Sequence, residues 1–297
     1  MADAAFNCVA ILDSIPSAEL QISKRLAEDL EDLRFANSNT PGIRYTRVES
    51  RDDLFRELDL LADAARDSGL RPLIHMECHG SRSGIQLAGC ETATWKELGE
   101  GLSRVNVETR LNLMAVFAVC HATYLTESFD LSGPAPVWGL IAPRGEISTG
   151  RVEADFGAMY RTLFRTLDPS AALQALNTKE GKPSYARITA ETLFLMAWRS
   201  YKREFCTPMK LEQRARAMRK KLIAEQGSRS IGLGKLRRLL KREEKPGFER
   251  MRDLYFMCDI YPDHRRRFAV TYKAAERFAN ENPSTKRSKR QRPFRRR

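Results

Sequence analysis

Two apolar runs of this chain end in side chains that can perform covalent catalysis. The first is LIHMECHG (residues 73–80), which ends in His79 and a glycine, and the second is LMAVFAVCHA (residues 113–122), which contains Cys120. Each run is typical of a buried strand. Because the carboxyl ends of neighbouring strands meet at one edge of an open α/β sheet, we expect His79 and Cys120 to lie side by side. The pair predicts catalysis by a cysteine nucleophile.

Such chemistry needs a nucleophile, a base and hydrogen-bond donors for the oxyanion. Cys120 is the candidate nucleophile, and His79 would take its proton and hold the sulfur as a thiolate. Gly80, which has no side chain, would let its N–H approach the reacting carbonyl, and the N–H of Cys120 would be a second donor. The sequence offers no third residue to orient the histidine. The alternatives are a His-Gly turn and a structural strand cysteine.

The elements that must position this pair alternate between strand and helix over the first 180 residues. The patterns predict strands at 6–12, 43–48, 72–77, 112–119 and 137–142, and helices at 22–35, 51–68, 94–105 and 152–167. Helices of this length between strands are typical of right-handed βαβ crossovers and a mostly parallel sheet. The predicted fold class is therefore α/β. On its strand, His75 is expected to be a core histidine, and Cys78 should face away from His79.

The rest of the chain differs in charge and pattern. Residues 1–200 hold 21 Lys and Arg against 27 Asp and Glu, whereas residues 201–297 hold 30 against 11. Basic helical patterns cover 211–224, 235–241 and 250–257, and 286–297 contains eight basic residues. We divide the chain into a catalytic domain at 1–180, a basic helical extension at 181–282 and a disordered basic tail at 283–297.

This asymmetry predicts an anionic partner for the second part of the chain. Nucleic acid is one candidate, since Lys and Arg that neutralise phosphates release counterions. An acidic protein surface is the other, and we favour it for the helices while leaving nucleic acid to the tail. The aromatic residues of this region are spaced for packing between helices rather than for stacking on bases.

The sequence also gives expectations about the cellular compartment of the protein and about its cofactors. The apolar residues 4–12 are flanked by Asp3 and Asp13 and follow no basic segment, unlike a secretory leader. No run approaches the roughly 20 apolar residues of a membrane span. The six cysteines form no CxxC pair, so we expect free thiols in the cytoplasm. We expect no metal, no cofactor and no membrane partner.

The order of elements and motifs resembles the caspase-like cysteine peptidases of clan CD, most closely the bacterial CHAT-domain branch. The resemblance spans about residues 5–177 and lies in segments 74–80, 114–122, 137–142, 156–163 and 170–176. It implies a caspase-like three-layer sandwich, a thiol protease with a His79–Cys120 dyad, protein substrates, and a role in antiviral defence or cell-death signalling. His121 departs from the branch, which usually has an acidic or small residue after the cysteine.

Family members often cleave after basic residues by means of an acidic pocket. Asp13 ends the first strand, and Glu146, Glu153 and Asp155 follow the fifth, so these acids can reach the same sheet edge. We expect a substrate-binding pocket for Arg or Lys, with Asp13 as its anchor and help from Asp155 and Glu153, because a carboxylate matches a guanidinium bidentately. The alternative is that these acids are ordinary surface charges.

We expect the activity to be controlled by another molecule and not by cleavage of the chain. Activation by cleavage in a linker after the cysteine strand needs a long linker, and the segment 124–136 has only 13 residues. We therefore expect activation by a regulatory protein partner or a ligand. The alternative function is a catalytically inactive caspase-like scaffold that binds nucleic acid or a protein through its basic C-terminal region.

Overall fold

The computed structural model describes residues 5–36, 40–129, 131–176, 185–226 and 231–281. Its contacts group into two compact units, Met1–Leu193 and Phe194–Arg297. The first unit ends beyond the boundary that we expected at residue 180, because a further strand joins its sheet. The basic tail expected at 283–297 lies outside the described residues.

A mixed sheet forms the centre of the first unit, with the strand order β2-β1-β3-β6-β7-β8. The strands are β1 (Cys8–Ser14), β2 (Gly42–Arg47), β3 (Pro72–Gly80), β6 (Met114–Ala118), β7 (Gly139–Pro143) and β8 (Tyr185–Thr189). All pairings on this path are parallel except that of β8 with β7. A short antiparallel pair, β4 (Gly84–Gln86) and β5 (Thr92–Thr94), extends from the end of β3. The expected mostly parallel α/β sheet is confirmed.

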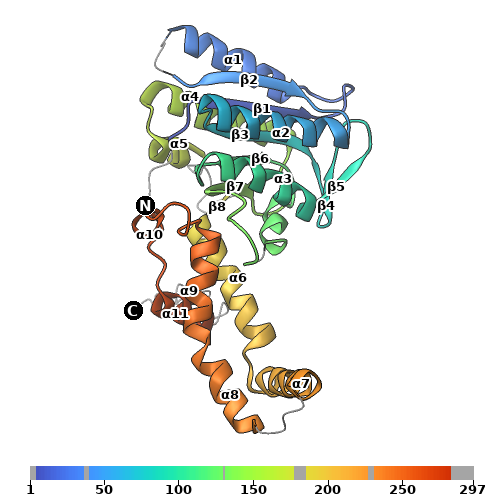
Figure 1. The fold of residues 1–297 in the computed structure, drawn as a ribbon. Helices are drawn as coiled ribbons and strands as arrows, with labels where there is room; N and C mark the ends of the chain where they lie inside the picture. Colours follow the sequence, from blue (N-terminus) through green and yellow to red (C-terminus); the bar gives the residue numbers. More distant parts are fainter. Residues whose placement is uncertain (1–4, 37–39, 130, 177–184, 227–230, 282–297) are drawn as a thin grey trace, which may run out of the picture. The chain divides into compact units, whose positions relative to one another are not determined.

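Helices cover both faces of this sheet (Figure 1). They are α1 (Ile22–Ala36), α2 (Arg51–Ser68), α3 (Trp95–Glu108), α4 (Thr149–Thr166) and α5 (Pro169–Leu176), with the 3-10 helix η1 (Ala122–Glu127) after β6. Ser23 of α1 and Tyr160 of α4 bond to Glu77 and His75, which share one face of β3, so α1 and α4 cover that face. On the opposite face, α2 packs against α3. The result is a three-layer arrangement.

The second unit is helical in the residues that the structure describes. It contains most of α6 (Ala190–Phe205), followed by α7 (Pro208–Gln226), α8 (Leu233–Arg242), α9 (Glu244–Tyr255), α10 (His264–Arg267) and α11 (Tyr272–Asn280). Its core is aromatic: the Trp198 ring meets Phe248 edge-on at 5.0 Å, and Phe256 stacks on Phe268 at 4.7 Å. These rings are buried, which confirms the prediction that they pack between helices. None of the described helices is long and apolar enough to cross a membrane.

Candidate active site

Strands β3 and β6 are direct neighbours, so their carboxyl ends lie at the same edge of the sheet. The parallel pairing matches His75 with Val116 and Glu77 with Ala118. His79 and Cys120 each lie two residues beyond this last pair. Strand β6 ends at Ala118, so Cys120 lies in the turn that follows it. The structure thus brings together the two segments that the sequence predicted to meet.

Gly80 is the point of contact between these segments. A Cβ atom built on Gly80 would lie 2.2 Å from the carbonyl oxygen of Cys120 and 2.5 Å from Cγ1 of Val119. Only a residue without a side chain allows the end of β3 to approach the cysteine turn this closely. The glycine of the His-Gly motif therefore allows the end of β3 to contact the turn that contains Cys120.

Replacing Gly80 by alanine should destabilise the first unit and slow the reaction of Cys120 with alkylating reagents. The new methyl group meets backbone, so β3 or the turn must shift, at a cost of about 1–3 kcal/mol in the free energy of unfolding. Urea unfolding and iodoacetamide labelling measure the two effects. Gly145→Ala is the matched control, because a Cβ there meets nothing within 4 Å. Equal unfolding midpoints for the two variants would contradict this account of Gly80.

His79 has a carboxylate partner that the sequence did not reveal. Its Nε2 lies 2.9 Å from Oε1 of Glu19, which belongs to the loop between β1 and α1. Both side chains are about half exposed, at 50% and 46%. With the carboxylate accepting from Nε2–H, the lone pair of the neutral ring is on Nδ1. Glu19 is thus a candidate orienting residue.

The sulfur of Cys120 contacts the backbone of the loop after β7. The N–H of Ile147 donates to Sγ at 3.4 Å, and Sγ lies 3.8 Å from the carbonyl oxygen of the same residue. The backbone of Ile147 therefore covers part of the sulfur.

Strand β3 also contains His75 and Cys78, and both side chains are buried. His75 lies in the core, where its Nδ1 is 3.1 Å from the Tyr160 hydroxyl, and burial lowers its pKa to about 3. Burial also raises the pKa of Cys78 well above its ordinary value. A neutral core histidine and a buried thiol are poor catalysts, which leaves His79 and Cys120 as the candidates on these two strands.

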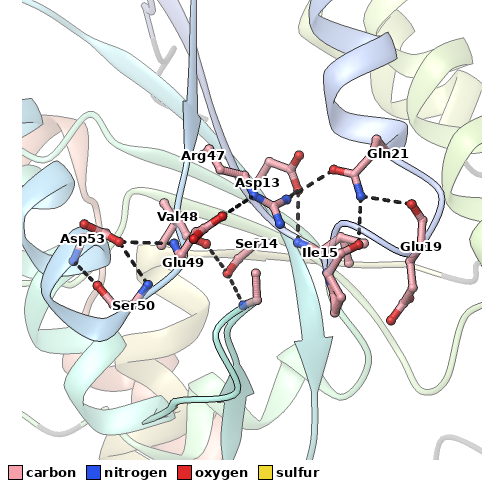
Figure 2. Close-up of polar contacts among 12 residues, drawn as sticks. Asp13, Ser14, Ile15, Glu19, Gln21, Arg47, Val48, Glu49, Ser50 and Asp53 are labelled. Carbon is pink, nitrogen blue, oxygen red and sulfur yellow. Dashed lines mark hydrogen bonds and ion pairs between the residues drawn. The ribbon is translucent and has the colours of Figure 1, made fainter.

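Asp13 is at the expected edge, but its carboxylate is already occupied. Its side chain is fully buried and accepts from the Ile15 N–H at 3.1 Å and from the Tyr45 hydroxyl at 2.7 Å, while Nη1 of Arg47 lies 3.2 Å away. Figure 2 shows Arg47 between Asp13, Gln21 and Glu49. A substrate guanidinium would have to displace Arg47 to reach Asp13. In this conformation Asp13 is a structural ion-pair partner rather than an open pocket anchor.

The two acids of α4 also have partners within the unit. Asp155 is buried, accepts from the Tyr185 hydroxyl at 3.0 Å and pairs with Arg151 at 3.3 Å. Glu153 is half exposed and pairs with Arg25 at 3.2 Å. Glu153 and Asp155 are thus each paired with an arginine, as Asp13 is with Arg47.

The residues that flank Cys120 include another carboxylate. Glu146 precedes Ile147, is 86% exposed and lies 3.9 Å from Nε2 of His121. His121 has left-handed backbone geometry (φ 61°) and turns the chain directly after the cysteine. Its ring lies near that of Tyr124, with the two centroids 6.1 Å apart.

A buried polar cluster lies at the same edge of the sheet. Glu77 bonds to Ser23 and is opposite Asp13 in the strand register, and burial raises its pKa to about 7. Among the described residues, no group of three or more His, Cys, Asp or Glu could hold a metal ion. The six cysteines are free thiols.

Comparison with known proteins adds no relative. No family model matches the chain, and no curated protein matches it.

Proposed function

We propose that the first unit is a caspase-like cysteine peptidase in which His79 and Cys120 form the catalytic dyad. The observation that supports it best is the close approach of the two strand ends. Gly80 approaches the backbone of Cys120 closely, and β3 and β6 are paired up to two residues before His79 and Cys120. A carboxylate on the histidine and an N–H on the sulfur add the polar partners that such a pair uses.

The proposed reaction uses these residues as follows. Nδ1 of His79 takes the thiol proton, and the sulfur of Cys120 attacks the carbonyl carbon of the scissile bond. The negative charge on the oxygen of the tetrahedral intermediate is stabilised by backbone donors, for which the N–H groups of Gly80 and Cys120 are our candidates. His79 then gives its proton to the departing amine, which leaves a thioester. Water, deprotonated by the same ring, hydrolyses the thioester and restores the thiol.

Protein substrates cut after Arg or Lys remain part of the proposal, although its anchor changes. Asp13 is paired with Arg47, whereas Glu19 and Glu146 are exposed and flank the dyad through His79 and Ile147. A basic side chain would therefore meet carboxylates at the rim of the site. Since Ile147 covers part of the sulfur, a partner or ligand that moves this loop would activate the enzyme.

The test is to locate the reactive cysteine and compare turnover in matched variants. Iodoacetamide at limiting concentration should label Cys120 ahead of Cys90, the exposed thiol, and His79→Ala should remove that preference. Fluorogenic peptides ending in Arg or Lys should be hydrolysed, and Cys120→Ala should abolish hydrolysis while Cys90→Ala should not. Turnover of peptides ending in Asp alone would overturn the basic preference.

Indifferent labelling of the accessible thiols, together with no hydrolysis of any peptide, would instead support the inactive scaffold. Because the resemblance to caspase-like peptidases is our ground for a role in bacterial defence or cell-death signalling, that role belongs to the same proposal. A cytoplasmic location is part of it too, on the ground that all six cysteines are unpaired.

A further inference from the structure

Helices α7 and α8 pack against each other and together have a large excess of positive charge. We call this pair, Pro208–Gln226 with Leu233–Arg242, the basic hairpin. Its two helices contain eleven Lys and Arg against two Glu. These charges belong to two packed helices of the second unit and are separate from the basic residues at 286–297.

Both acidic residues of the basic hairpin are already paired within it. Glu212 binds Arg216 at 3.0 Å and Arg237 at 3.2 Å, and Glu225 binds Lys221 at 3.7 Å. Five exposed cations have no salt bridge to any carboxylate in the part of the chain that the structure describes: Lys220, Lys235, Arg238, Lys241 and Arg242. A polyanion that pairs with such exposed cations gains free energy from the counterions it releases.

The apolar side of α8 is used for folding, which argues against a membrane partner. Leu236 is 1% exposed, and Leu233 and Leu240 are partly covered, so Leu239 is the one clearly exposed leucine of this helix. A helix that lies in a membrane interface needs a broad exposed apolar face beside its basic one. On α7 the exposed large apolar side chains are Met209 and Met218, which are few beside the exposed cations of the basic hairpin.

The basic hairpin also lacks the groups that read single-stranded bases. Neither α7 nor α8 contains a Phe, Tyr, Trp or His. Recognition of single strands relies on stacking of bases against aromatic rings. Arg and Lys without such rings favour the regularly spaced phosphates of a duplex, which Arg can bind bidentately.

We therefore propose that the basic hairpin binds the phosphate backbone of double-stranded nucleic acid without sequence preference. A double helix offers a dense, regular row of negative charges to cations on two adjacent helices, whereas an acidic protein would need carboxylates placed to match. This inference is independent of the peptidase proposal, because it uses no residue of the candidate active site.

The experiment measures binding of the full chain to fluorescein-labelled DNA and RNA duplexes of random sequence between 50 and 200 mM salt. With four phosphate contacts, the plot of log K against log salt should have a slope of about −3 to −4. Lys220, Arg238, Lys241 and Arg242 are then changed to Gln together. At 100 mM salt this variant should bind at least about 100-fold more weakly, because four counterion-releasing contacts are lost.

Two matched variants remove the same number of charges elsewhere. One changes Lys245, Arg250, Lys273 and Arg277, which are exposed on α9 and α11, and the other changes four arginines of the tail, Arg290, Arg292, Arg295 and Arg296. Both should bind far better than the hairpin variant. Equal losses in all three, or a loss confined to the tail variant, would overturn the proposal.

A fourth variant separates charge from folding. Exchanging Lys for Arg and Arg for Lys at the same four hairpin positions keeps the charge and should retain duplex binding, while loss of binding here would count against a backbone contact. Anionic lipid vesicles and poly-glutamate are the competing ligands. Hairpin-dependent binding to either of them that is tighter than binding to the duplexes would replace the proposal with a membrane or an acidic protein partner.

Discussion

Replacing His79 by alanine should lower the rate of peptide hydrolysis by about 10²- to 10⁴-fold, the range that positioned acid-base groups contribute. In the proposed mechanism the variant loses the proton acceptor for Cys120 and the proton donor for the leaving amine, while β3 keeps its backbone and Gly80 its contact with the turn. The measurement is kcat/KM on a fluorogenic peptide at fixed pH, with unfolding midpoints to show that the fold is intact.

Two further variants make this result specific. His121→Gln changes the neighbouring histidine, which faces Glu146 and Tyr124, and should retain most activity. Glu19→Gln keeps the size of the side chain but removes the charge that holds the ring, so it should lower kcat less than His79→Ala and leave KM nearly unchanged. If His121→Gln proves as damaging as His79→Ala, the base has been assigned to the wrong residue.

Replacing Glu77 by glutamine should stabilise the protein at alkaline pH by as much as about 3 kcal/mol. Burial raises the pKa of this carboxyl from 4.5 to about 7, so the folded chain keeps the proton over a range in which the unfolded chain has lost it. Stability from this group is full below about pH 4.5 and declines as the pH rises to about 7, at about 1.4 kcal/mol per unit. The amide of glutamine has no proton to lose.

Urea unfolding between pH 5 and 8 measures this effect. The wild-type free energy of unfolding should fall across the range relative to that of Glu77→Gln, and the gap should stop growing above about pH 7. The groups that face Glu77 are Ser23 and the carboxylates of Asp13 and Glu153. Glu153→Gln is the control, since Glu153 is half exposed and should leave the profile almost unchanged. Parallel profiles for wild type and Glu77→Gln would contradict the assignment.

The strands that lead to His79 and Cys120 could be predicted from the sequence because the signal for a strand is local. Residues 72–77 and 112–119 are mainly apolar and are each followed by a Cys-His pair. Helix α2 likewise carries local signals at both ends, a capping box at Ser50 and a left-handed Gly69. The sequence pattern does not predict strand β8. This strand has only five residues, contains Arg187 and is followed directly by α6.

The partners of the site were harder to predict, because they depend on where loops run in space. Glu19 lies in a loop without periodicity, and its contact with His79 spans 60 residues of sequence. For Asp13 the strand pattern gave the correct sheet edge, but a pattern in one strand does not say that Arg47 of the neighbouring strand neutralises it. Position along a strand is encoded locally, whereas the choice of ion-pair partner is not.

Helix α6 limits how the chain can be divided experimentally. It starts at Ala190, in the sheet-containing unit, and runs without a break to Phe205, past Trp198 in the aromatic core of the second unit. A truncation after Leu193 would leave a fragment of one helical turn, too short to persist. A cut after Phe205 would take Trp198 away from Phe248. Either cut would therefore remove part of the structure of one unit. Biochemical work on either unit is best done by point substitution in the intact polypeptide.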